Sequence, residues 1–213
     1  MKVLTIPVTP FAQNCRVIAC DETGKAAIVD PGGDAEKIIA LVKQHNLSIE
    51  FILLTHGHLD HVGASQLLAK EFGIEIVGPH EEDKFWLDGL PMQAQMFGFA
   101  PHDAFLPHRW LDEGDVVALG KLQLQVRHCP GHTPGHVVFY EPVSATVLVG
   151  DVLFKGSVGR TDFPKGDASQ LKHAINTKLF TLDDETKVMS GHGEDTTIGY
   201  EKRNNPFMSG RFG

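Results

Sequence analysis

Short apolar runs separated by polar turns alternate along the whole chain, a pattern typical of strands in a mixed α/β domain. The runs fall into two groups, because residues 79–105 carry no such pattern. Each group contains an apolar run that is followed closely by polar, chemically active side chains. The expected strands are 3–8, 15–20, 26–29, 51–54 and 74–77 in the first group and 122–128, 136–140, 146–149 and 187–189 in the second.

Longer stretches with apolar residues at helical spacing predict helices over 34–45, 61–72 and 168–176, and a short one at 81–87. The stretch 92–105 mixes Met, Phe, Pro and Gly without a clear period, so a long loop is expected there. The last residues, 203–213, are expected to form a loosely ordered tail.

Both groups run through strands and then through a strand, a turn and a helix. This order favours an α/β fold in which two mixed sheets pack face to face and helices cover the outer faces. A length of 213 residues suits one domain, 1–213, that consists of two half-domains with a boundary near 105–115.

Four of the apolar strands end in side chains that bind metals. Three histidines and an aspartate fall within the six residues 56–61, directly after the strand 51–54. A single histidine at a strand end is usually structural, but four such strand ends in one chain indicate a metal site that combines imidazole and carboxylate ligands. The candidate ligands are His56, His58, Asp60, His61, His132, Asp151 and His192.

Composition narrows the possible partners and the compartment. A formal net charge of −8 argues against binding to nucleic acids or to an anionic membrane surface. Three cysteines without a CxxC pair argue against a secreted disulfide framework, and neither a signal peptide nor a membrane span is apparent. We therefore expect a cytoplasmic protein that is a monomer or a weak homo-oligomer and acts on a small molecule.

The spacing His-x-His-x-Asp-His at 56–61, followed by His, Asp and His at later strand ends, resembles the metallo-β-lactamase superfamily. The resemblance covers nearly the whole chain and implies an αββα four-layer sandwich with its metal site at one edge of the two sheets. It also implies two metal ions, with Asp30 as a support rather than a ligand. In the implied assignment His56, His58 and His132 hold the first ion, Asp60, His61 and His192 hold the second, and Asp151 bridges both.

Within the superfamily, residues 55–61 and 131–136 are similar to glyoxalase II, the hydroxyacylglutathione hydrolase, and above all to its short bacterial forms. This resemblance implies hydrolysis of a glutathione thioester such as S-lactoylglutathione, with zinc, iron or manganese as the divalent metal. Asp60 and Asp151 would be the catalytic carboxylates. Residues 159–163 also resemble the persulfide dioxygenases, so a mononuclear iron enzyme of that kind stays the alternative. An Asp at position 151, where the best-known β-lactamases carry Cys, disfavours β-lactam hydrolysis.

Long glyoxalase II chains grip glutathione with basic residues of a C-terminal helical domain that this sequence does not contain. The expected substitutes are Lys155 and Arg160, which follow Asp151 within nine residues. Arg suits a carboxylate because its planar guanidinium donates two parallel hydrogen bonds. For the remaining candidates a structural role is expected, with His136 as an ordinary hydrogen-bonded histidine and Phe163 and Cys129 as buried packing residues.

Overall fold

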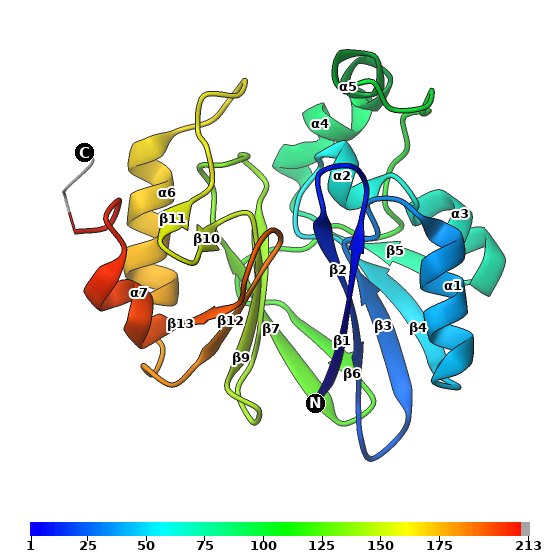
Figure 1. Cartoon of the computed structure of the whole chain (residues 1–213), viewed down its shortest axis with the longest axis horizontal. Helices are drawn as coiled ribbons and strands as arrows, with labels where there is room; N and C mark the ends of the chain where they lie inside the picture. Colours follow the sequence, from blue (N-terminus) through cyan, green and yellow to red (C-terminus); the bar gives the residue numbers. More distant parts are fainter. Residues whose placement is uncertain (210–213) are drawn as a thin grey trace.

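The computed structural model of the chain describes residues 1–209. Two main sheets pack face to face, and helices cover both outer sides (Figure 1). This confirms the four-layer αββα sandwich expected from the sequence. The strand order is β1-β2-β3-β4-β5 in the first sheet and β13-β12-β9-β8-β7-β6 in the second.

The first sheet is antiparallel from β1 to β3 and parallel from β3 to β5. The parallel part brings the carboxyl ends of three strands to one edge, where the chain leaves each strand toward the same end of the molecule. The bounds of these strands are β1 (Lys2–Val8), β2 (Gln13–Ala19), β3 (Lys25–Val29), β4 (Ser48–Leu53) and β5 (Glu75–Val77).

The second sheet is antiparallel except for the parallel pair β12 and β9. A separate two-stranded ribbon, β10 with β11, follows β9. The expected strands in this half are confirmed, whereas β6, β10, β11 and β13 are short and were not predicted. Their bounds are β6 (Val116–Leu119), β7 (Leu122–His128), β8 (Val137–Glu141), β9 (Thr146–Gly150), β10 (Leu153–Phe154), β11 (Ser157–Val158), β12 (Lys187–Ser190) and β13 (Thr196–Thr197).

Helices α1 (Ala35–Gln44) and α3 (Ser65–Phe72) cover the first sheet. On the opposite side of the molecule α6 (Ala168–Ala174), its π-helical continuation at Ile175–Leu179 and α7 (Ile198–Asn204) cover the second (Figure 1). Within residues 1–209, no helix has the length and apolar character needed to cross a membrane. The remaining helices lie near one end of the sheets: α2 (Leu59–Val62), the 3-10 turn Glu81–Asp83, α4 (Lys84–Asp88) and α5 (Leu90–Phe97).

Side-chain alternation along the strands builds three apolar layers from one sequence pattern. In β3, Ala26 and Ile28 face α1 and α3, whereas Ala27 and Val29 face the second sheet. In β9, Leu148 faces the first sheet while its neighbours face α6. Because successive side chains of a strand point to opposite faces, a strand buried on both faces reads as a continuous apolar run.

The helix expected over 61–72 is two helices, α2 and α3. They separate at Gly63 and Ala64, where the backbone of residues 31–32 approaches. The Ala64 amide donates to Pro31 O over 2.8 Å, and a Cβ at Gly63 would lie 2.5 Å from Gly32 O. The approaching segment therefore leaves no room for a regular helix at this point.

The loop expected over 92–105 contains a helix, α5, as far as Phe97. Pro91 stands in its first turn and Gly98, with φ of 70°, ends it. The helical period is hidden in the sequence because Met92 and Met96 are apolar but exposed.

Of the expected tail, 203–213, residues 210–213 lie outside the described residues. Its earlier part is held to the domain, contrary to that prediction. Asn205 is buried, and its side-chain amide donates to Ser157 O over 2.9 Å and to the Glu201 carboxylate over 2.8 Å.

Two polar side chains of β2 fix the loop after β12 to the first sheet. The side-chain amide of Asn14 donates to Ser190 O over 3.1 Å, and its backbone N–H donates to Gly191 O over 2.7 Å. Arg16 is buried, donates to Ser190 O over 2.9 Å and forms an ion pair with Asp195. These bonds place the end of β12, and the histidine that follows it, against the opposite sheet.

Replacing Arg16 by Met should keep the packing of the side chain but remove one of the two donors to Ser190 O and the charged partner of Asp195. We expect a loss of about 2–3 kcal/mol in the free energy of unfolding, because a hydrogen bond to a charged group is lost at a buried site. Urea unfolding in the presence of a chelator measures this without a contribution from metal binding. The matched control is Lys25→Met, whose half-exposed ion pair with Glu50 is worth less than about 1 kcal/mol. Equal losses in both variants would contradict the role of Arg16.

Candidate metal centre

The structure brings all seven predicted ligand side chains to one end of the two sheets. Those of the segment 56–61 follow β4 of the first sheet and continue into α2. The other three follow β7, β9 and β12 of the second sheet. The side chains form two neighbouring groups, each completed by residues of both sheets: His56, His58 and His132, and Asp60, His61 and His192.

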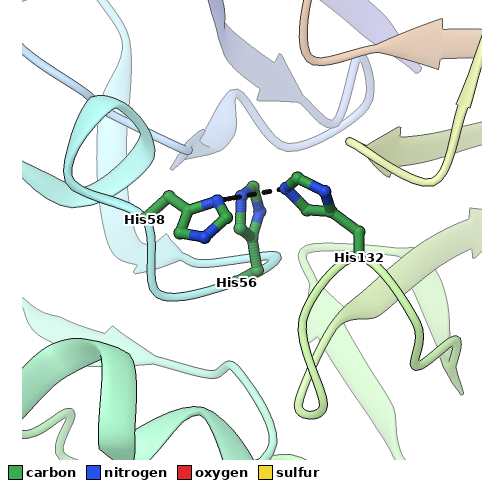
Figure 2. A group of neighbouring side chains, drawn as sticks. All are labelled: His56, His58 and His132. Atoms are coloured by element: carbon green, nitrogen blue, oxygen red, sulfur yellow. Dashed lines mark hydrogen bonds between the residues drawn. The ribbon is translucent and has the colours of Figure 1, made fainter. Parts of the chain in front are cut away.

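In the first group three imidazole nitrogens converge on one point (Figure 2). His58 Nδ1 lies 3.1 Å from His56 Nε2 and 3.0 Å from His132 Nε2. A neutral imidazole nitrogen holds one proton or one lone pair, so His58 Nδ1 cannot form a good hydrogen bond to both partners. Three nitrogens bound to one tetrahedral zinc ion at 2.0–2.1 Å lie roughly 3.3 Å apart. The spacing therefore fits three ligands of one metal ion.

In the second group His61 Nε2 and His192 Nε2 are 3.3 Å apart, and Asp60 Oδ2 lies 3.3 Å from His192 Nε2. The Asp151 carboxylate lies between the two groups. Its Oδ1 is 3.3 Å from His61 Nε2, and its Oδ2 is 3.7 Å from His132 Nε2. Oδ1 is buried and has no hydrogen-bond partner among the described residues. Asp151 thus stands where a bridging ligand would stand.

Hydrogen bonds to the outer nitrogens of the imidazoles set their tautomers. Thr55 Oγ1 donates to Asp30 Oδ2 over 2.7 Å and accepts from His56 Nδ1 over 3.0 Å. His61 Nδ1 donates to the same Asp30 oxygen over 3.0 Å. Both imidazoles therefore direct an Nε2 lone pair into the site, as metal-binding histidines do. Asp30 has the supporting position that the sequence indicated.

The two histidines from the second sheet are oriented in the same way. His132 Nδ1 donates to Arg160 O over 2.7 Å, and His192 Nδ1 donates to Phe11 O over 3.2 Å. All four Nε2 atoms are thus free to bind a cation. The donor set, its tautomers and the nitrogen spacing fit two metal ions.

Burial and electrostatics divide the imidazoles into two classes. For His56 and His58, burial and the neighbouring imidazoles lower the pKa well below its usual value. These side chains are neutral at pH 7, which is the form that binds metals. Burial alone would lower the pKa of His61, but the carboxylates of Asp151 and Asp60 raise it well above the usual value. The negative charge of those two carboxylates stabilises a positive charge next to them.

His136 has a more specific position than the ordinary structural role expected from the sequence. Its Nε2 accepts a hydrogen bond from the backbone N–H of Asp151 over 3.0 Å. Its ring stacks on His56, with centroids 4.6 Å apart and an interplanar angle of 16°. His136 therefore supports two candidate ligands from behind. Cys129, in contrast, is buried in the apolar layer beneath α6, as expected, and burial raises its pKa to about 12.

Gly191 shows why small residues surround the site. A Cβ at this position would lie 2.3 Å from Asp151 Oδ1 and 2.8 Å from the Cε1 atom of His61. Any larger residue would push the loop that carries His192 away from the centre. Glycine is therefore required by this close approach.

Asp83 is a buried carboxylate that the sequence did not single out. It accepts hydrogen bonds from the Gly57 amide over 2.8 Å, the Thr133 hydroxyl over 2.8 Å and the Gly135 amide over 2.6 Å. These donors belong to the two loops that carry the first imidazole group. Burial raises the pKa of Asp83 to about 7, against the three donors that lower it. Asp83 ties the loop from the first sheet to the loop from the second.

A signal for Asp83 was nevertheless present in the sequence. Trp86, Leu87 and Leu90 follow it at intervals of three, four and seven residues and are all buried. An acidic residue in register with the apolar face of a helix points inward, and a buried carboxylate requires donors. The preceding residues at 81–82 are also acidic, so Asp83 does not stand out within the helix predicted at 81–87.

A cavity of about 440 Å³ opens above the two groups. Asp60, Asp151 and His192 contribute to its lining, together with Arg160 and Phe163. Phe163 is therefore a cavity residue, contrary to the packing role expected for it. The guanidinium of Arg160 lies over the Phe163 ring at 4.2 Å and pairs with the exposed Asp162.

Lys155, the other residue predicted to bind substrate, does not line the cavity. Its ammonium group forms an ion pair with Glu194. The structure therefore brings Arg160, but not Lys155, to the candidate site.

A further cluster of His80, Glu82 and His128 lies outside the cavity. His80 Nδ1 accepts from the Glu82 amide over 3.2 Å, and His128 Nε2 donates to Pro134 O over 2.7 Å. These bonds place protons on both Nε2 atoms and occupy the groups that would bind a metal. The cluster is better explained by the stacking of its two rings, with centroids 4.2 Å apart.

Asp83→Asn should weaken metal binding at the first group by about tenfold or more, the usual effect of losing a support behind a metal ligand. Whichever way the new amide is turned, its NH₂ group faces an N–H or O–H that the carboxylate accepted. Competition with a chromophoric chelator measures the affinity. The control is Asp88→Asn at the end of the adjoining helix α4, which removes an exposed ion pair with Lys84. Unchanged affinity in Asp83→Asn would show that the two loops hold their geometry without it.

Comparison with known proteins places these features in a family. The model of the metallo-β-lactamase superfamily matches residues 8–192. The chain is 50% identical to hydroxyacylglutathione hydrolase GloC of Haemophilus influenzae over 212 residues, 99% of this chain and 100% of that protein.

Among solved structures, the B3 metallo-β-lactamase BLEG-1 superposes with a TM-score of 0.90 at 37% identity, over 98% of this chain and 100% of the other. The di-iron-bound form of TTHA1623 superposes with a TM-score of 0.88 at 39% identity, over 96% of this chain and 99% of the other. With its sandwich, its paired ligand groups and these full-length matches, the chain belongs to the metallo-β-lactamase superfamily.

Proposed function

We propose that the protein is a metal-dependent hydrolase of glutathione thioesters such as S-lactoylglutathione, releasing a hydroxy acid and a free thiol. The observation that carries the proposal is the pair of ligand groups that share the Asp151 carboxylate at the floor of a cavity. The substrate class is taken from the relative that is 50% identical over nearly the whole chain and is named a hydroxyacylglutathione hydrolase.

The proposed ligands are those of the two groups, with Asp151 as the bridge, and the proposed ions are divalent zinc, iron or manganese. A similar structure is a di-iron form, which supports a two-metal site without deciding the metal. When bound, such ions polarise a carbonyl oxygen and lower the pKa of bound water from near 16 toward 7.

The protein's own groups would position the reactants and move protons. Asp60 and Asp151 both line the cavity, so either carboxylate can accept a proton from the attacking water. Asp30 keeps the proton of His61 on Nδ1, away from the reacting groups. The leaving thiolate has a pKa near 8.5 and departs without a strong acid. The site therefore needs bases and electrophiles more than a general acid.

Arg160 is the proposed contact for a carboxylate of glutathione. It lies where the cavity meets a second depression of about 410 Å³, which Thr161 and Lys172 also line. Nε and Nη2 of Arg160 donate to Asp162, so Nη1 remains for a ligand. Lys172 has no ion-pair partner among residues 1–209 and adds a second positive charge to that depression.

We also propose a cytoplasmic location. The three cysteines are free and buried, and the lack of any pairing between them fits a reducing compartment.

Asp151→Ala should lower kcat for S-lactoylglutathione by several orders of magnitude and reduce the metal content from the expected two ions per chain. The reason is that one carboxylate serves both ligand groups and the reacting water. Elemental analysis of protein purified without chelator gives the metal content independently of turnover, and circular dichroism checks the fold.

Offering other substrates to the wild-type protein separates thioester hydrolysis from the alternative activities. Oxygen uptake with glutathione persulfide, together with a single iron per chain, would favour the persulfide dioxygenase. A β-lactam is included because one similar structure is named a metallo-β-lactamase. Absence of S-lactoylglutathione hydrolysis by the metal-replete protein would reject the proposed function.

Arg160→Ala should raise KM for the glutathione thioester by about tenfold, near 1.4 kcal/mol, and leave kcat nearly unchanged, because it removes binding that is equal in the ground and transition states. A thioester of the same acid with a small uncharged thiol serves as the substrate control and should show no increase in KM. Lys155→Ala is the matched variant, since Lys155 lies outside the cavity lining. An equal KM for wild type and Arg160→Ala would exclude Arg160 from substrate recognition.

A further inference from the structure

One wall of the cavity consists of aromatic rings from segments far apart in the sequence. Phe11 comes from the turn between β1 and β2, Trp86 from α4 and Phe97 from the end of α5, and these elements gather at one end of the molecule (Figure 1). We call this surface the aromatic wall. Its members are Phe11, Trp86, Phe97, Phe99 and Phe163.

The rings of the aromatic wall are in continuous edge-to-face contact. Phe11 lies 5.4 Å from Phe99 and 6.0 Å from Phe97, measured between centroids. Phe163 lies 6.4 Å from Phe97 and 6.1 Å from Trp86. Such contacts fix the rings relative to one another, so the wall is a preformed surface rather than a set of independent side chains.

The aromatic wall begins directly beside the candidate metal ligands. The Trp86 ring lies 4.5 Å from the His58 ring, and the Phe163 ring lies 5.2 Å from it. A group one or two bonds away from a carbonyl that reacts at this site would therefore touch the wall. The wall is a candidate surface for the acyl part of the substrate.

The exposure of the outer rings is unusual for residues that serve only to pack the core. Phe11 is 46% and Phe97 41% exposed, whereas the core residue Phe139 is 0% exposed. Large rings left open to water beside an enzyme site are covered when an apolar ligand binds. The polar neighbour Gln93 offers no competing recognition, because its amide is already bonded to Leu59 N and to Trp86 O.

Most of the charge lies in the other parts of the cavity, and the Arg160 guanidinium, which lies over the Phe163 ring, marks the border of the aromatic wall. The carboxylates of Asp60 and Asp151 lie with the ligand groups, and Arg160 marks the approach to the depression that contains Lys172. A thioester matches this division if its thiol-derived part carries carboxylates and its acyl part is apolar. The charged part would extend past Arg160, and the acyl part would lie on the aromatic wall.

We propose that the aromatic wall is an acyl-group subsite and that the enzyme favours thioesters of 2-hydroxy acids with an aromatic side chain over the lactoyl thioester. This inference rests on the proposed thioester hydrolysis and adds the class of acyl group.

The experiment compares S-mandeloylglutathione with S-lactoylglutathione, which share the thiol and the 2-hydroxyl group and differ by a phenyl in place of a methyl. For the wild-type protein, kcat/KM should be about tenfold or more higher for the mandeloyl thioester, because a larger apolar group fills the subsite. In Phe97→Ala the mandeloyl-to-lactoyl ratio should fall about fivefold, as expected from the loss of ring contacts.

The control variant is Met96→Ala, which truncates the neighbouring residue of α5. Met96 is 68% exposed and does not line the cavity, so the ratio should not change. A wild-type ratio of one or less, or an equal loss with both thioesters in Phe97→Ala, would overturn the acyl subsite. Hydrolysis of neither thioester would instead reject the proposed function.

A binding measurement reads the subsite without turnover. Free mandelate should quench the fluorescence of Trp86 at concentrations about tenfold lower than those at which lactate does, and Trp86→Phe should abolish the signal. The other tryptophan, Trp110, does not line the cavity. Equal titration by the two acids would count against the aromatic wall even if the thioesters are hydrolysed.

Discussion

Buried carboxylates that accept several hydrogen bonds from the ligand loops hold the site together. Asp30 accepts from the backbone and side chain of Thr55 and from the imidazole of His61. Asp83 joins the loop after β4 to the loop after β7. An unsatisfied buried carboxylate is costly, so each of these bonds constrains both partners. The positions of His56 and His61 follow from this network, because their outer nitrogens are bonded to Thr55 and Asp30 before any cation arrives.

Most of the architecture could be predicted because its signals are local. A strand buried on both faces appears as a continuous apolar run, and the side chains at its end stand next to it in the sequence. The histidine and aspartate positions were therefore visible without a structure. Helix α5 was not, since Met92 and Met96 face water and conceal its period. The break between α2 and α3 depends on a contact with residues 31–32, which no local pattern records.

Asp30 was indicated as a support, but Asp83 and the specific roles of His136 and Phe163 were missed for a different reason. Their roles depend on partners brought together by the tertiary fold. His136 matters because the amide of Asp151 points at it, and Phe163 because its ring faces a cavity built from other segments. Lys155 shows the opposite error, since nearness in sequence to Asp151 did not bring it to the cavity. Sequence spacing locates side chains that leave a strand end, but not those that meet across the fold.

The division of each ligand group between the two sheets has a consequence for how the molecule is assembled. Neither group is complete within one half of the chain, so an ion bound at either group links the halves and opposes their separation. The group with His132 can form as soon as β7 is in place, whereas the group with His192 must wait for β12, the last strand but one. During synthesis the two candidate ligand groups would thus be completed in a fixed order, the second only after β12 has emerged.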